Sequence, residues 1–202
     1  MTTTTKLTRA ALGFCTHTGW AAMIAVSGSA TSPVILDRRR IEMIPGSDPE
    51  APPFVYHAAR ELDRNGAERF VQEASELSRI KAMGALEVVV GELRNRHYEV
   101  VGSGIVVRQP LAASLEAILK SHSRIHAAEG ELFRGAIRKA SEALKIPVTE
   151  VRAGELQERG AKALGTSLAK LPQHLATIGR AAGRPWAKDQ KDALLAAVLA
   201  LS

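Results

Sequence analysis

The sequence predicts an α/β domain built on a five-stranded mixed sheet, with three antiparallel strands first and two parallel strands after them. Residues 9–44 hold apolar runs separated by short turn-forming stretches, a pattern typical of an antiparallel meander. Residues 56–94 and 111–144 have helical periodicity, and a short strand-like run follows each of them. Helix alternating with strand favours parallel pairing, so the whole order predicts a mixed sheet.

The antiparallel part comprises three predicted strands. Two apolar runs within residues 9–26 meet at Gly19, which predicts two strands and a tight turn. The run Pro33–Ile44 predicts the third strand. The stretch Pro45–Pro53, rich in proline, predicts a loop that ends the meander.

The next segment predicts the first crossover. Residues Tyr56 to Arg94 read as helical, and Gly66 is expected to divide a short helix from a long one. The run His97–Val107 then predicts the fourth strand. Gly102 and Gly104 inside it indicate a bulge or a close approach of another backbone.

The remaining residues predict a second crossover and a helical C-terminal part, 153–202. One long helix is expected from Leu111 to Leu144, and Ile146–Val151 is expected to be the fifth strand. Pro185 suits the first turn of the last helix. The three predicted C-terminal helices are Ala153–Leu164, Ser167–Ala182 and Pro185–Leu201. We expect residues 1–202 to form a single domain whose first eight residues are frayed.

The composition narrows the function classes. A formal charge of +6 favours phosphates or an acidic partner, whereas aromatic residues, at 4%, leave few rings for stacking on bases. The lone Cys15 excludes an internal disulfide and a cysteine metal cage. No apolar run reaches the ~18 residues of a membrane span, and the N-terminus lacks the pattern of a signal peptide. We therefore expect a cytoplasmic protein without a membrane partner.

The C-terminal stretch WAKDQKDALLAAVLAL carries the most specific motif. It contains D-x-x-D-A-L at Asp189, Asp192, Ala193 and Leu194, followed by small and apolar residues. With the order of elements, this stretch resembles the ribonuclease H-like superfamily, and in particular Holliday-junction resolvases of the RuvC type. The resemblance implies a metal-dependent nuclease in which carboxylates from the first strand, the fourth strand and the last helix hold two Mg²⁺ ions.

The chain departs from this pattern at two of the expected acids. The first-strand acid would fall near Thr16 or His17, and the fourth-strand acid near Gly102 to Gly104. His17 could replace a ligand, but imidazole suits zinc or manganese better than magnesium.

Asp189 and Asp192 lie at i and i+3 on one helix face, so they could share a metal. The alternative is that they are ordinary first-turn acids paired with Lys188 and Lys191.

A second polar constellation lies on the predicted helix 111–144. His122, His126 and Glu129 fall on its apolar stripe, one turn apart from one another, which is the spacing of a helical metal-binding pair followed by a carboxylate. Buried polar groups need partners, so a metal, a substrate or ordinary hydrogen bonds must satisfy them. Glu131 lies on another face and is expected to be solvated.

These residues give a functional hypothesis with alternatives. The candidate catalytic residues are His17, Glu129, Asp189 and Asp192, the candidate metal ligands are His122, His126 and Glu129, and the candidate nucleic-acid contacts are Arg38 and Arg40. The first hypothesis is a divergent ribonuclease H-like protein that binds or cleaves nucleic acid, with Mg, Mn or Zn as the metal. The alternatives are a nucleotide- or small-molecule-binding module, or a catalytically inactive structural or partner-binding protein that forms a homodimer through its C-terminal helices.

Overall fold

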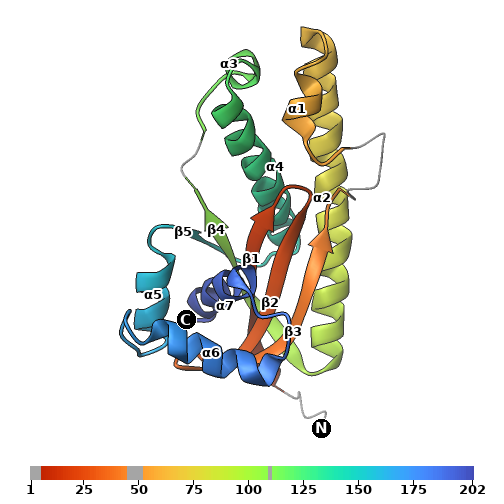
Figure 1. The fold of residues 1–202 in the computed structure, drawn as a ribbon. Helices are drawn as coiled ribbons and strands as arrows, with labels where there is room; N and C mark the ends of the chain where they lie inside the picture. The colour runs from red at the N-terminus through yellow and green to blue at the C-terminus, as the bar shows by residue number, and fades with distance from the viewer. Residues whose placement is uncertain (1–5, 45–51, 109–110) are drawn as a thin grey trace.

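A computed structural model describes residues 6–44, 52–108 and 111–202. Its elements form one five-stranded sheet of order β3-β2-β1-β4-β5 with helices on both faces (Figure 1). In chain order they are β1 (Thr8–His17), β2 (Trp20–Ser29), β3 (Ser32–Glu42), α1 (Val55–Ala59), α2 (Arg64–Asn95), β4 (Tyr98–Val107), α3 (Leu115–Leu119), α4 (His122–Ala143), β5 (Val148–Arg152), α5 (Leu156–Ala163), α6 (Leu171–Ala182) and α7 (Lys188–Leu201).

The predicted mixed sheet is confirmed. β1, β2 and β3 form an antiparallel meander, and Gly19, at φ 81°, lies in the turn between the first two strands. β4 pairs in parallel with β1, and β5 in parallel with β4. Parallel neighbours need a crossover connection, and the two crossovers place β4 and then β5 on the side of β1 opposite to β2.

Each face of the sheet has its own helical layer and core. Leu12, Phe14 and Met23 point to the face covered by α2 and α4. Ala11 and Ile24 point to the opposite face, where α7 crosses the sheet and α5 and α6 lie outside it (Figure 1). Successive residues of a strand point to opposite faces, so this division also decides which site residues can meet.

Glycines let α7 lie unusually close to the sheet. A Cβ atom on Gly13 would lie 2.0 Å from the Ala193 carbonyl oxygen. A Cβ on Gly104 would lie 2.0 Å from the carbonyl oxygen of Ala196, and one on Gly102 would lie 2.3 Å from that of Ala200. The expected close approach at Gly102 and Gly104 is confirmed. The bulge is also present, because the β1–β4 register shifts between Ala10 and Ala11.

The expected single helix from Leu111 to Leu144 is wrong. The structure has two helices there, α3 and α4, separated at Ser121, whose φ of −135° and ψ of 115° are extended. The hydroxyl of Ser114 accepts a hydrogen bond from the Ala117 N–H and caps the start of α3. Serine favours helix starts over helix interiors, so Ser114 and Ser121 each begin a new helix. The apolar periodicity of the sequence concealed this break.

Other predicted boundaries are also wrong, including the starts of α5 and α6, which lie three and four residues later than expected. The break before α2 lies at residues 60–63 instead of at Gly66, because Asp63 caps α2 by accepting the Gly66 N–H. Pro185 precedes α7, which begins at Lys188. The predicted loop Pro45–Pro53 and the expected frayed terminus fall mostly on residues 45–51 and 1–5, which lie outside the described residues.

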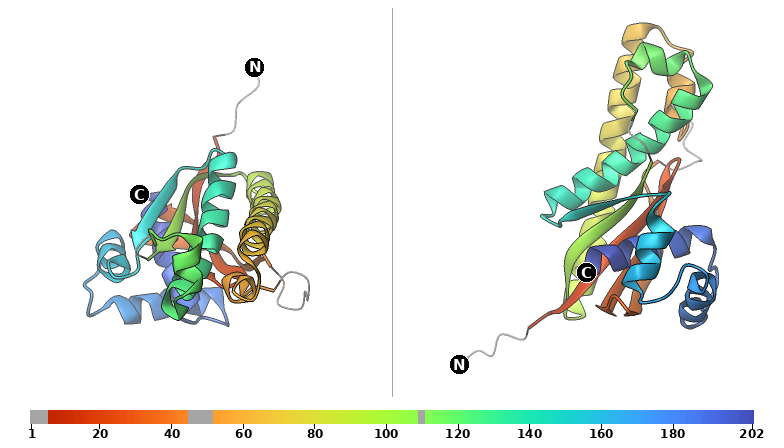
Figure 2. Two further views of the ribbon diagram at one scale, coloured as in Figure 1. Left: turned by 90° about the horizontal axis from the view of Figure 1, so that it is seen from above. Right: turned by 90° about the vertical axis from the view of Figure 1, so that its left-hand side faces the viewer.

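The helices of the first layer extend past the end of the sheet. There α1, α3 and the N-terminal parts of α2 and α4 form a separate bundle, which we call the helical projection (Figure 2, right). Its small core contains Ile118, Ile125 and Ala128, against which Tyr56 packs. Among the helices within the described ranges, none combines the length and the apolarity that crossing a membrane requires.

Candidate functional site

The end of β1 and the start of α7 bring three potential metal ligands together, which we call the β1–α7 cluster: Cys15, His17 and Asp189. Cys15 and His17 are two residues apart on β1 and so lie on the α7 face, whereas Thr16 faces the other way. His17 Nε2 lies 3.0 Å from Asp189 Oδ1, although the contact lacks hydrogen-bond geometry. The Cys15 sulfur lies 4.0 Å from the same oxygen.

The environment of Cys15 keeps its thiol protonated. Burial, with smaller contributions from the carboxylates of Asp192 and Asp189, raises the pKa of Cys15 to about 12. Asp192 is itself buried and forms an ion pair with Lys188, one helical turn before it on α7. The two aspartates therefore have different partners, and only Asp189 belongs to the β1–α7 cluster.

This set of residues does not fit two magnesium ions. Magnesium requires oxygen ligands in octahedral geometry, whereas the β1–α7 cluster offers one thiol, one imidazole and one carboxylate. Gly102 and Gly104 are so close to the α7 backbone that no side chain fits at either position. The expected fourth-strand carboxylate is thus sterically excluded. A softer ion of the zinc type suits the donors better, once the thiol is deprotonated.

Aromatic and basic side chains border the β1–α7 cluster. His17 stacks on Trp20 with ring centroids 4.4 Å apart, and the Arg40 guanidinium lies 4.1 Å from the Trp20 ring centroid. Arg40 also forms an ion pair with Glu42. Arg38 is used differently, since its guanidinium donates to the carbonyl oxygens of residues 183, 184 and 185 before α7.

A second cluster lies on the helical projection and comprises His57, His122 and His126; we call it the histidine cluster. One ring nitrogen of each residue lies within 4.8 Å of the others. His122 Nε2 and His126 Nε2 are 3.1 Å apart on α4, and His57 comes from α1. The β1–α7 cluster and the histidine cluster share no residue, so His17 does not join His122 and His126.

Glu129 connects the histidine cluster to the protein interior. Its side chain is 1% exposed, and its Oε1 lies 2.8 Å from Nδ1 of His57. The backbone N–H of His57 also donates to Oε1, at 3.4 Å. Its Oε2 is buried without a hydrogen-bond partner among the described residues, 3.8 Å from Nδ1 of His126.

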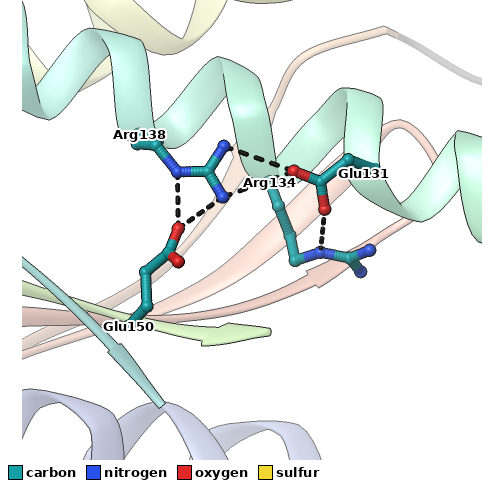
Figure 3. A network of polar contacts seen from close by, with 4 residues as sticks. All are labelled: Glu131, Arg134, Arg138 and Glu150. Carbon is teal, nitrogen blue, oxygen red and sulfur yellow. Dashed lines mark hydrogen bonds and ion pairs between the residues drawn. The ribbon is translucent and has the colours of Figure 1, made fainter. Parts of the chain in front are cut away.

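Glu131 is not simply solvated, as the sequence suggested. Its carboxylate accepts from the guanidinium of Arg134, which is buried, and from that of Arg138 (Figure 3). Arg138 also pairs with Glu150 on β5, so the network links α4 to the sheet. Burial lowers the pKa of Arg134, while the neighbouring Glu131 opposes that effect.

Two members of these clusters were not among the predicted site residues. Cys15 entered the sequence analysis only as a lone cysteine that excludes a disulfide, and its half-buried position near Asp189 depends on how α7 crosses the sheet. His57 lies in a five-residue helix where Val55 and Ala59 are buried, a pattern too short to reveal its partner on α4. A histidine just after a proline-rich loop was the one available signal.

Comparison with known proteins identifies the fold. No protein-family model and no curated protein matches the chain. Thermus thermophilus RuvC in complex with a Holliday junction substrate matches with a TM-score of 0.55 and 13% identity, over 94% of this chain and 90% of that chain. A second Thermus thermophilus RuvC structure matches with a TM-score of 0.52 and 13% identity, over 94% and 91%. The chain therefore has the ribonuclease H-like fold of RuvC, with a helical C-terminus.

Proposed function

We propose that this protein binds branched or duplex DNA through the end of the sheet that carries the β1–α7 cluster, and that it does not hydrolyse DNA with two magnesium ions. The observation that carries the proposal is the structural match to RuvC in complex with a Holliday junction substrate, which spans nearly the whole of both chains. The chain's charge of +6 supports the same class of ligand, because phosphates attract a basic protein over long range.

The side chains beside the cluster suit a nucleic acid. Arg40, Trp20 and His17 form a continuous stack at the end of the sheet. The rings of this stack already cover one another, and the group that can reach a nucleic acid is the Arg40 guanidinium, which can contact phosphate. Glu42 neutralises part of the Arg40 charge, so we expect a modest contribution from this arginine. Arg38 serves the loop before α7 and contributes less to binding.

The chemistry near the stack argues against a two-magnesium nuclease. Asp189 faces His17, and Asp192 is held by Lys188. Gly102 and Gly104 exclude a third carboxylate. Two-metal hydrolysis needs oxygen ligands that bridge both ions, and one accessible carboxylate cannot supply them. A single zinc or manganese ion at the β1–α7 cluster fits the donors better and would leave binding as the main activity.

The test measures the fluorescence anisotropy of a labelled four-way junction, a labelled duplex and a labelled single strand as the protein is added. The titrations are repeated at salt concentrations from about 50 to about 200 mM. We expect salt-dependent binding that favours the junction or duplex. Arg40→Gln should weaken binding and lower the salt slope by about one. Arg159→Gln is the matched control, because it removes the same charge from an ion-paired, exposed arginine on α5, which packs against α7 and carries none of the residues of the stack.

Two outcomes would refute the proposal. A flat isotherm at the lowest salt would remove nucleic acid from consideration, and an equal effect of Arg40→Gln and Arg159→Gln would place the interface elsewhere. Incubation of the protein and the same junction with MgCl₂ or MnCl₂ tests the claim that the protein does not hydrolyse DNA with two magnesium ions. Cleavage in MgCl₂ that His17→Gln leaves intact would contradict the absence of a two-magnesium centre.

A further inference from the structure

We propose that the histidine cluster binds one divalent transition-metal ion of the zinc type. His57, His122 and His126 supply the ligands, and the buried Glu129 orients His57 and His126. The site lies on α1 and α4 of the helical projection and shares no residue with the β1–α7 cluster. It does not depend on DNA binding, and it differs from the set that helix spacing alone suggests, because His57 from α1 takes the place of Glu129 as the third ligand.

The ligand spacing is already close to that of a metal site. Nitrogen ligands about 2.0–2.1 Å from a tetrahedral zinc ion lie about 3.3 Å apart. His122 Nε2 and His126 Nε2 are 3.1 Å apart, on consecutive turns of one helix. The His57 ring approaches both, with centroids 5.4 Å from His122 and 4.9 Å from His126. Small rotations of exposed rings would bring all three nitrogens onto one ion.

Glu129 selects which nitrogen of His57 is available. A carboxylate 2.8 Å from Nδ1 holds the proton on that atom and leaves Nε2 with a lone pair. Its second oxygen lies 3.8 Å from Nδ1 of His126, within reach of the same interaction after a slight turn of the ring. Metal-binding histidines almost always donate their other N–H to a carboxylate or carbonyl in this way.

The buried carboxylate provides an independent reason to expect a cation. Glu129 is 1% exposed and its Oε2 has no hydrogen-bond partner within the described chain, which is costly for a charged group. A metal ion on the far side of the imidazoles would polarise their N–H groups toward this carboxylate. Three imidazoles favour zinc and its neighbours over magnesium, and the exposure of His122 and His126 leaves a fourth position open to water.

The test uses the full chain without a histidine tag, stripped with a chelator and titrated with ZnCl₂ by calorimetry. Absorption of the Co²⁺ form supplies a second readout of tetrahedral nitrogen ligation. We expect one ion per chain at the histidine cluster. Glu129→Gln should weaken binding about 10–100-fold, as loss of an orienting carboxylate does elsewhere. His57→Gln and His122→Gln should weaken it more, because each removes a ligand.

The control is His174→Gln, which changes a histidine on α6 outside both clusters and should leave the affinity unchanged. Absence of zinc binding by the wild-type chain overturns the proposal. So does binding that survives His122→Gln but is lost in His17→Gln, since the ion would then occupy the β1–α7 cluster. His122 is exposed on a helix surface, so circular dichroism should match the wild type. The His122→Gln variant should still bind DNA like the wild type, so a failure of the zinc proposal can be distinguished from a failure of the DNA-binding proposal.

Discussion

The closeness of α7 to the sheet predicts that Gly104→Ala is strongly destabilising. The added Cβ would lie 2.0 Å from the Ala196 carbonyl oxygen. An ordinary contact is about 3.5 Å, so the helix or the strand must move by roughly 1.5 Å. Backbone faces backbone here, and neither a rotamer change nor a flexible side chain can relieve the clash.

The magnitude follows from how α7 is packed. Overpacking a well-filled core costs typically 1–3 kcal/mol, and the buried residues of α7 must move together. We expect a loss of about 3 kcal/mol, at the upper end of that range. For a chain of about 200 residues this corresponds to a fall in Tm of roughly 6–12 °C, at about 2–4 °C per kcal/mol.

The assay is thermal unfolding followed by circular dichroism, with urea unfolding as the measure of free energy. Gly84→Ala is the matched control, because a Cβ there meets nothing within 4 Å on the exposed side of α2. It should raise stability by up to about 1 kcal/mol through helix propensity. A Gly104→Ala protein as stable as the wild type would refute the packing argument, and with it the claim that no carboxylate fits at this position of β4.

Three further predictions concern side chains with defined partners. The pKa of Cys15, about 12, leaves little thiolate at pH 8, so alkylation should be on the order of 1000-fold slower than for an exposed cysteine and should accelerate as pH rises toward 12; rapid labelling of the folded protein would contradict this. The buried hydroxyl of Ser141 donates to that of Ser103 at 3.0 Å, so Ser141→Ala should cost about 1–3 kcal/mol in urea unfolding, and the double alanine variant should cost less than the sum of the single variants. Arg38→Lys cannot reproduce the contacts to three carbonyl groups, and faster proteolysis at residues 183–187, without a loss of DNA binding, is the expected result.

Local patterns carried most of the fold. Alternating apolar runs and the turn at Gly19 are consequences of strand geometry and backbone conformation, so they specify the meander without distant contacts. The alternation of helix and strand likewise predicted the parallel pairs. The same patterns concealed the break at Ser121. The apolar periodicity continues across this residue, whereas its backbone is extended and interrupts the helix.

The candidate sites depended on tertiary structure. Helix spacing by itself placed His122 beside His126, because residues four apart always share a helix face. Only the packing of α1 against α4 brings His57 to them, and only the crossing of α7 over β1 brings Asp189 to His17. Such contacts join residues far apart in the chain, and what decides them is the shape of two packed surfaces, which no local repeat encodes.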